Sequence, residues 1–139
     1  MDGTSSDRAA ASASYGDALL LLARRRVKSR EENVQLAITA YEKALEFYTP
    51  EAFPLQHARL LDHMGNCFIT LAEMRDRRLN LDKALDLMRR AETVYGKRGD
   101  DIRKASLYND LGAVHLELSQ LSDTEQNLES AIRAFQSSL

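Results

Sequence analysis

Residues 33–48, NVQLAITAYEKALEFY, decide the fold because their pattern returns twice more along the chain. The asparagine that opens the stretch recurs at intervals of 47 residues, at Asn33, Asn80 and Asn127. The alanine four positions later keeps the same interval, at Ala37, Ala84 and Ala131. A period of roughly 20–50 residues is typical of arrays in which one supersecondary unit stacks on the next. The sequence therefore predicts three related units.

Each unit is predicted to contain two helices. In the second unit, apolar or small residues recur every three or four positions, at Ala58, Leu61, Met64, Gly65 and Phe68. This spacing places them on one stripe of a helix. No stretch of the chain alternates apolar and polar residues with a period of two, so strands are not expected. The predicted fold class is therefore all-α.

The recurring asparagine predicts where the second helix of each unit begins. Asparagine is a favoured N-cap because its side-chain oxygen can accept a hydrogen bond from an exposed backbone N–H group. We therefore expect Asn33, Asn80 and Asn127 to start these helices. Small residues allow two helix backbones to approach closely. Gly65 is accordingly expected to meet Ala84 where the two helices of the second unit cross.

The domain organisation follows from the same register. Residues 1–6 are predicted to be a disordered lead. Residues 7–53, 54–100 and 101–139 are predicted to be helical repeats 1, 2 and 3. The third repeat is shorter than the others, so its truncation is an open alternative. A chain of 139 residues has the size of one domain.

Composition limits the possible classes of function. The formal net charge is −2, which gives no reason to expect nucleic acid as a partner. Cys67 is the only cysteine, so no intrachain disulfide can form and the fold does not depend on an oxidising compartment. The longest apolar run, residues 18–23, is far shorter than the roughly 20 residues of a membrane span. We expect a cytoplasmic protein that has no membrane partner.

Small and aromatic residues at fixed spacings give the units a family resemblance. The second unit has Leu61-x2-Met64-Gly65-x2-Phe68, followed by Ala84-x3-Met88-x2-Ala91. The third has Tyr108-x2-Leu111-Gly112-x2-His115, followed by Ala131-x3-Phe135. The first keeps only Ala37-x3-Tyr41-x2-Ala44 and has Ala18 where the others have glycine. These motifs resemble the tetratricopeptide repeat family of helix–turn–helix units, in a variant whose unit is 47 rather than 34 residues long.

The resemblance implies a right-handed α-solenoid of three antiparallel helix pairs. It also implies a protein–protein interaction scaffold rather than an enzyme. Such a scaffold binds a peptide or a partner protein in a concave groove lined by the first helix of each unit. Carried over by register, the groove residues are Tyr15, Arg59, Asp62, Asn66 and Asn109. The chain departs from the family pattern in its longer period and in having no tryptophan.

A group of basic residues near the turns of the first two units is a second candidate site. Its members, which we call the basic ridge, are Arg24, Arg25, Lys28, Arg30, Arg75, Arg77 and Arg78. One interpretation is a surface for an anionic partner, such as an acidic peptide, a phosphopeptide or a nucleic acid. The alternative is ordinary charge at helix ends, partly neutralised by Glu31 and Glu32. No aromatic residue interleaves the arginines, which disfavours nucleic acid.

Metal binding and catalysis have little support. His63 and Cys67 lie four residues apart, as two metal ligands on a helix can, but a structural zinc ion needs four ligands and no second pair accompanies them. The chain carries no phosphate-binding glycine loop and no nucleophile motif. We therefore predict no metal site, no cofactor and no enzymatic activity.

Self-assembly is the remaining alternative. The last helix carries Ile132, Phe135 and Leu139 at spacings of three and four, and no residues follow to cover this stripe. A terminal unit of an array normally needs a polar outer face. We therefore expect the chain to form a homodimer or to be part of a longer array.

Overall fold

The computed structural model describes residues 3–26, 28–98 and 101–139, and within them the chain forms six helices and no strand. The helices are α1 (Gly3–Arg25), α2 (Arg30–Phe47), α3 (Pro54–Ala72), α4 (Arg77–Arg98), α5 (Asp101–Ser119) and α6 (Thr124–Ser138). The prediction of an all-α fold is confirmed. None of these helices is both long enough and apolar enough to cross a membrane.

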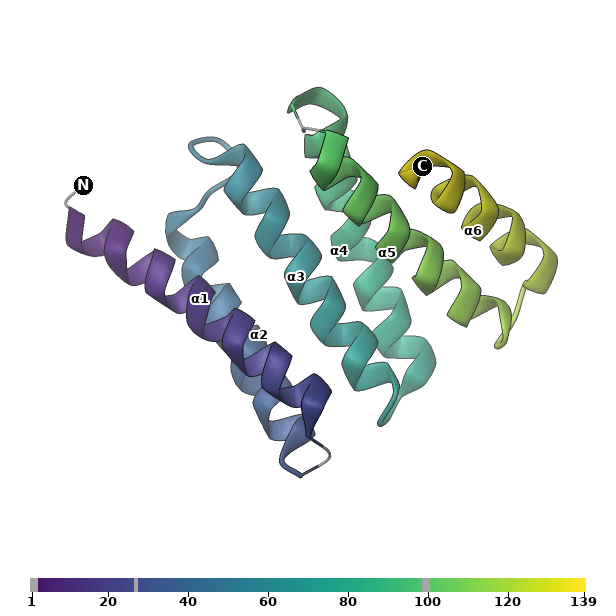
Figure 1. Ribbon diagram of the computed structural model, residues 1–139, viewed down its shortest axis with the longest axis horizontal. Coiled ribbons are helices and arrows are strands. Elements are labelled where there is room, and N and C mark those ends of the chain that lie inside the picture. Colours follow the sequence, from purple (N-terminus) through teal and green to yellow (C-terminus); the bar gives the residue numbers. More distant parts are fainter. Residues whose placement is uncertain (1–2, 27, 99–100) are drawn as a thin grey trace.

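Consecutive helices pack most closely as hairpins. The hairpins are α1 with α2, α3 with α4, and α5 with α6, and smaller contacts join α2 to α3 and α4 to α5. In Figure 1, α1, α3 and α5 lie side by side on the near face, and α2 and α4 lie behind them. We call this near side the α1/α3/α5 face. Because each hairpin packs on the next, the fold has the character of a helical repeat.

The turn inside each hairpin has the same backbone geometry three times. A residue with a left-handed conformation precedes the second helix, at Ser29, Asp76 and Asp123, with φ of 61°, 42° and 50°. Each of their carbonyls accepts a hydrogen bond of 2.9 Å from the backbone N–H of the asparagine four residues later. Left-handed residues other than glycine are uncommon, although aspartate tolerates the conformation. Their recurrence every 47 residues makes the sequence period a structural one.

The prediction that the asparagines begin the second helices is wrong. These helices begin three residues earlier, at Arg30, Arg77 and Thr124. Asn80 and Asn127 lie within the first turn, and their side-chain amides donate to the carbonyls of Arg75 and Ser122 at 2.9 and 3.0 Å. The asparagine therefore closes the preceding turn instead of capping the helix. A side-chain amide can do this because it is a donor as well as an acceptor.

The predicted meeting of Gly65 and Ala84 is confirmed. A Cβ atom added at Gly65 would lie 3.4 Å from the carbonyl oxygen of Ala84 and 2.9 Å from Cε of Met88. In the third hairpin, a Cβ atom at Gly112 would lie 2.6 Å from the ring of Phe135. Met88 and Phe135 are separated by the same 47 residues as the two glycines. Each glycine therefore makes room for a large side chain of the facing helix.

Overpacking at this crossing is expected to be costly. Ala84→Leu should lower the free energy of unfolding by about 1–3 kcal/mol, because Ala84 is fully buried and a close-packed crossing has no room for added carbon atoms. Thr93→Leu, at an exposed position of the same helix, is the matched control and should change it by no more than about 0.5 kcal/mol. Denaturant titration measures both. Equal stability of the Ala84→Leu variant and the parent chain would contradict this packing.

The first hairpin has a different register between its helices. Ala18, predicted to stand in for the glycine, is exposed. The ring of Tyr41 instead packs on Gly16, where an added Cβ atom would lie 2.7 Å from it. Tyr41 lies 47 residues before Met88, so the second helices keep the period and α1 is displaced by two residues. The cause is steric, since the fully buried tyrosine ring requires a residue without a side chain opposite it.

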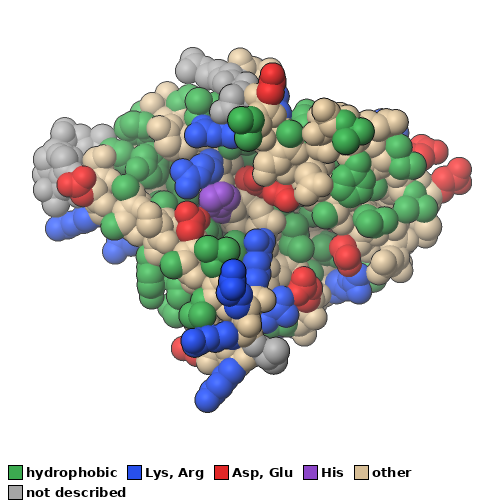
Figure 2. Space-filling view, viewed as in Figure 1, with side chains coloured by type: hydrophobic (Ala, Val, Ile, Leu, Met, Phe, Trp, Pro, Cys, Tyr) green, Lys and Arg blue, Asp and Glu red, His purple; other side chains and the backbone are tan. Residues whose placement is uncertain are grey.

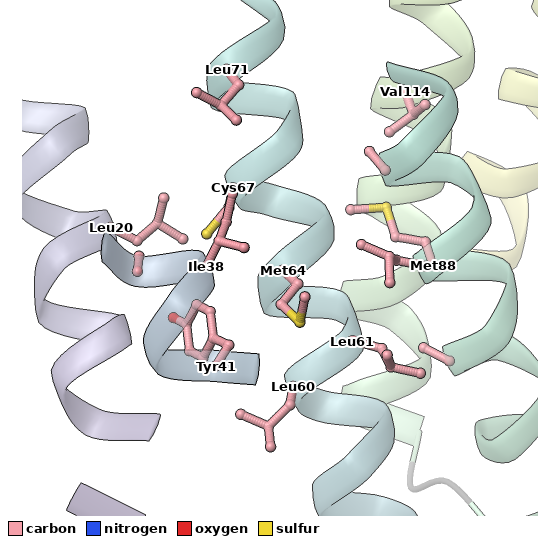
Figure 3. Packing of buried hydrophobic residues seen from close by; sticks show 14 of the residues in the cluster. Leu20, Ile38, Tyr41, Leu60, Leu61, Met64, Cys67, Leu71, Met88 and Val114 are labelled. Carbon is pink, nitrogen blue, oxygen red and sulfur yellow. The ribbon is translucent and has the colours of Figure 1, made fainter. Parts of the chain in front are cut away.

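The apolar core extends from the first hairpin to the third. Figure 3 shows Leu20 of α1 and Ile38 of α2 beside Cys67 of α3, and Tyr41 of α2 with its ring turned toward α1. Cys67 is fully buried, and burial raises the pKa of its thiol to about 12. The thiol is therefore protonated at neutral pH and acts as a packing group.

The expectation of a disordered lead at residues 1–6 is wrong for the part that the structure describes. α1 begins at Gly3, so residues 3–6 belong to this helix, and residues 1 and 2 lie outside the described residues. The helix is anchored nearby, because Ala9 is buried and the Ser12 hydroxyl donates to the Ala40 carbonyl at 2.7 Å. An anchored helix adds residues more readily than it nucleates, which carries it into the preceding serine and threonine residues.

Candidate functional site

The α1/α3/α5 face has ionisable side chains at its centre. Figure 2, which views this face, shows acidic, basic and histidine side chains gathered there, with apolar side chains around them. The hydrogen bonds between these side chains define two clusters. One joins α1, α2 and α3, and the other joins α3 to α5. Because α3 belongs to both, it is the central element of the candidate site.

The first cluster is centred on Asp17 of α1. Its Oδ1 accepts hydrogen bonds from the hydroxyl of Tyr41 at 2.6 Å and from Nδ1 of His63 at 2.9 Å. Its Oδ2 lies 3.6 Å from Nη2 of Arg59. One carboxylate thus ties together side chains from three helices. The two partly buried hydrogen bonds hold the Tyr41 and His63 side chains in defined positions, and Arg59, whose side chain is 51% exposed, lies beside them.

Burial controls the protonation of this cluster. It lowers the pKa of His63, although Asp17 opposes the shift, so the imidazole is neutral at neutral pH. Burial and the adjacent Asp17 raise the pKa of Tyr41, which keeps its hydroxyl a donor. Because Nδ1 of His63 bonds to a carboxylate, the ring proton is on Nδ1 and Nε2 is an acceptor. The cluster therefore presents both an acceptor nitrogen and the donors of Arg59.

A hollow of about 150 Å³ lies beside this cluster, between α1 and α3. Its lining includes Ala10, Ala13, Asp17, Gln56, Arg59 and His63. The α1 side is formed partly by alanine methyl groups, and the α3 side carries polar side chains. The hollow can therefore receive a small group that is apolar on one side and forms hydrogen bonds on the other.

Tyr15, predicted to line the groove, is not among the residues that line the hollow beside Asp17. Because α1 is displaced, Ala13 and Asp17 occupy the places that Asp62 and Asn66 have on α3. Tyr15 is turned by about 200° around the helix from Asp17 and is 55% exposed. Sequence reasoning missed Asp17. The available signal was the dipeptide Gly-Asp at 16–17, which matches Gly-Asn at 65–66 once the register is shifted.

The second cluster pairs two carboxyl groups between α3 and α5. Asp62 is 8% exposed, lies close enough to Asp110 for the two carboxyl groups to interact, and has a buried Oδ1 without a hydrogen-bond partner. Nδ2 of Asn66 donates to Oδ2 of Asp110 at 3.2 Å. Burial, followed by the charge of Asp110, raises the pKa of Asp62 to about 8. At neutral pH the Asp62 carboxyl is therefore mainly protonated, which is the form that can donate to the Asp110 carboxylate.

The other predicted groove residues lie at different depths. Arg59 is half-exposed and lines the hollow, and Asn109 is exposed on α5. Asn66 is half-buried and bonded to Asp110, whereas Asp62 lies beneath the surface. A ligand can therefore reach Arg59 and Asn109 directly. Asp62 is not directly accessible, because its carboxyl is buried beside Asp110.

The basic ridge is largely paired with acidic side chains. Four of its seven members form ion pairs, which are Arg30 with Glu73, Arg75 with Glu31, Arg77 with Glu117, and Arg78 with Asp82. The first three pairs join neighbouring hairpins. Arg24, Arg25 and Lys28 are exposed, and Figure 2 shows basic side chains gathered at the lower edge of the molecule. Because most of the ridge is neutralised locally, it is not a continuous cationic surface.

The residues that could bind metal are otherwise engaged. No group of three or more histidine, cysteine, aspartate or glutamate side chains in the described ranges could hold a metal ion. His63 directs its Nδ1 to Asp17, and Cys67 is fully buried. The absence of a cofactor and of enzymatic activity stays a prediction.

Comparisons with models of protein families, with curated proteins and with solved structures find no match to this chain. Its geometry is therefore the basis on which a function can be proposed. The tetratricopeptide resemblance remains an interpretation of the repeat motifs.

Proposed function

We propose that this protein is a protein–protein interaction scaffold that holds a segment of a partner protein on the α1/α3/α5 face. In this proposal the three hairpins form a right-handed α-solenoid of the tetratricopeptide type, with this face on its concave side. The repeated turn geometry and the glycine contacts between paired helices support a regular stacking of hairpins. The single buried thiol needs no oxidising compartment, so we propose that the scaffold acts in the cytoplasm.

The observation that carries the proposal is the hollow beside Asp17. The carboxylate of Asp17 already bonds to Tyr41 and His63, so its role is to position them. Arg59 and His63 are then left as a donor and an acceptor that line the same hollow. A peptide backbone offers both a carbonyl and an N–H group to such a donor and acceptor, and the alanines of α1 leave space for a small side chain. The hollow therefore fits a peptide segment.

Site-specific photocrosslinking tests where the partner binds. A benzophenone amino acid at Gln56, in the hollow, is expected to capture a partner protein in cells, and the same amino acid at exposed Thr93 of α4 is the control. Arg59→Ala is then expected to weaken the binding of the captured partner by on the order of tenfold, as the removal of a hot-spot arginine does. Thr93→Ala should have no effect. Capture from Thr93 but not from Gln56 would place the partner elsewhere and refute the proposal.

Self-association is a second candidate, favoured by the outer side of α6. Leu128 and Ile132, one turn apart on this helix, are 38% and 55% exposed, and Leu139 is fully exposed. A second copy could cover this stripe through an isologous contact. Sedimentation at micromolar concentration is expected to show a dimer that Ile132→Glu dissociates. A monomer at every concentration would refute self-association, and partner binding would then be the remaining proposal.

Nucleic acid is not proposed as a partner. Arg30, Arg75 and Arg77 of the basic ridge are each paired with a glutamate of an adjacent hairpin. Phosphate contacts would have to displace these carboxylates. The ridge is therefore better explained as part of the contact between hairpins, although each exposed pair contributes little by itself.

A further inference from the structure

A second hollow, of about 230 Å³, lies between α4, α5 and α6. It shares no lining residue with the hollow beside Asp17. The side chains that give it its chemistry are Arg89, Glu92, Tyr108, His115, Ser130 and Arg133. Two guanidinium groups from two different helices thus meet around one histidine, which is 6% exposed.

The hydrogen bonds of His115 define its tautomer. Nδ2 of Asn127 donates to the Ser122 carbonyl, so Oδ1 of Asn127 is free to accept. Nδ1 of His115 lies 3.1 Å from this oxygen and therefore carries the ring proton. Nε2 is left with its lone pair, 3.3 Å from Nη2 of Arg89. Burial, and then the charges of Arg89 and Arg133, lower the pKa of His115 even though Asn127 opposes the shift.

The hollow has an excess of positive charge. Among the described residues, no carboxylate lies within ion-pairing distance of Arg89, whose contact is with His115. Arg133 lies 3.9 Å from Glu129 on its own helix, in an exposed pair, and donates to the Ser130 hydroxyl at 3.2 Å. Glu92 is the one carboxylate in the lining, and burial together with this neighbouring Glu92 raises the pKa of Tyr108. The lining itself therefore holds two cations and one anion, with Glu129 outside it, and the neutral histidine can become a third cation.

We propose that this hollow binds the phosphate of a phosphate monoester. Arg89 and Arg133 donate to its oxygens from two helices, with the Ser130 hydroxyl beside them. His115 takes a proton at Nε2 when the anion enters, exchanges its contact with Arg89 for one with a phosphate oxygen, and keeps its Nδ1 bond to Asn127. Donors from two directions and a buried imidazole suit a tetrahedral dianion better than a planar carboxylate, which one guanidinium can saturate.

The size of the hollow limits what the phosphate is attached to. Its volume is below the roughly 300–1,000 Å³ of clefts that enclose drug-sized ligands. It holds a phosphate with a few attached carbon atoms, such as a phosphorylated side chain or a small phosphorylated metabolite. The two sources share one chemistry at the site and differ only in what lies outside it.

Calorimetric titration of the full chain tests the site. Phosphoserine blocked at both ends and glycerol 3-phosphate are expected to bind saturably in the millimolar range, and blocked serine is expected not to bind. The compound that binds more tightly identifies the source of the phosphate. Tighter binding of blocked phosphoserine indicates a phosphorylated protein, and tighter binding of glycerol 3-phosphate indicates a small metabolite. Failure of both to saturate overturns the proposal.

Charge variants separate the site from general surface charge. Arg89→Gln is expected to weaken phosphate monoester binding by about tenfold or more, and Arg89→Lys to weaken it less, because lysine keeps the charge but loses the fork of donors. Arg90→Gln is the matched control, since Arg90 is the next residue of α4, is exposed and lies 4.0 Å from Asp86. Equal weakening by the Arg89→Gln and Arg90→Gln variants overturns the proposal. Unaltered thermal melting of the Arg89→Gln variant shows that the loss is local.

Protonation of His115 gives a readout that a folding defect would not mimic. The ionisable groups facing it are Arg89 and Glu92 from α4, Tyr108 from α5 and Arg133 from α6. Sulfate keeps its charge across neutral pH, so its affinity should rise several-fold from about pH 8 to about pH 6 only if a protein group gains a proton. This rise is expected to vanish in a His115→Gln variant. A rise that persists without His115 overturns the assigned role.

Discussion

Gly16→Ala is expected to lower the free energy of unfolding by about 2–4 kcal/mol. The added Cβ atom would lie 2.7–2.9 Å from three atoms of the Tyr41 ring, which is fully buried and cannot swing into solvent. Overpacking alone typically costs about 1–3 kcal/mol. Displacing the ring also strains the hydrogen bond from its hydroxyl to Asp17, and bonds to charged groups contribute about 1.5–3 kcal/mol. Denaturant titration of the full chain measures the loss.

Gly96→Ala is the matched control for this prediction. Gly96 lies inside α4, and an added Cβ atom there would meet nothing within 4 Å. Alanine is a better helix former than glycine by about 1 kcal/mol, so this variant should be slightly more stable than the parent chain. If Gly16→Ala were also stabilising, helix propensity would dominate at both positions. The contact between Gly16 and Tyr41 would then be wrong.

The sequence was sufficient to predict the pairing of helices in the second and third hairpins. Gly65 with Met88 and Gly112 with Phe135 obey one register, because small residues and the large residues that they accommodate recur together. The same reasoning failed in α1. A period read from identical residues favours Ala18, whereas packing selects Gly16 because Tyr41 needs a position without a side chain. Sequence identity and steric fit are different criteria, and steric fit determines which residue of α1 lies opposite Tyr41.

The turns and the polar clusters could not be derived in the same way. An asparagine near a helix start is predicted to be a cap, but the alternative, in which its amide closes the preceding turn, depends on the left-handed residue at Asp76 or Asp123. A single sequence does not indicate which aspartate adopts a left-handed conformation. The partner of Asp62 is equally hidden, since Asp110 lies 48 residues away and is not its repeat equivalent, which is Asn109.

The pair of Asp62 and Asp110 gives the second prediction of large effect. Asp62→Asn is expected to stabilise the folded protein by about 2–4 kcal/mol at about pH 8 and to have little effect at about pH 4. The amide mimics the protonated acid, which is the form that the buried site favours. It can donate to the Asp110 carboxylate as the protonated carboxyl can, and it carries no charge that burial would penalise.

The direction of the pH dependence follows from whether the folded or the unfolded state binds the Asp62 proton more tightly. Burial raises the pKa of Asp62 from 3.8 to about 8 in the folded chain. The stability that this group contributes is therefore complete below about pH 4, where both states are protonated, and is lost as the pH rises through about 8. The lowered pKa values of His63 and His115 act in the opposite sense, since they reduce stability as the pH falls. The histidines contribute equally to the parent chain and to the Asp62→Asn variant. Their contribution therefore cancels when the two free energies of unfolding are subtracted at each pH.

Denaturant titrations of both chains at several pH values between about 4 and 8 provide the measurement. Asp86→Asn is the matched control, because Asp86 has a 73% exposed side chain and its replacement should give a small difference that does not vary with pH. Asp110→Asn should stabilise the chain less than Asp62→Asn does, because it removes the neighbouring charge but leaves the Asp62 carboxyl buried. If Asp62→Asn instead destabilised the chain at about pH 8, the Asp62 carboxylate would be ionised and satisfied in the folded state. The contact between α3 and α5 would then carry two negative charges, and Asn66, which donates to Asp110, would be the one side chain among the described residues known to offset them.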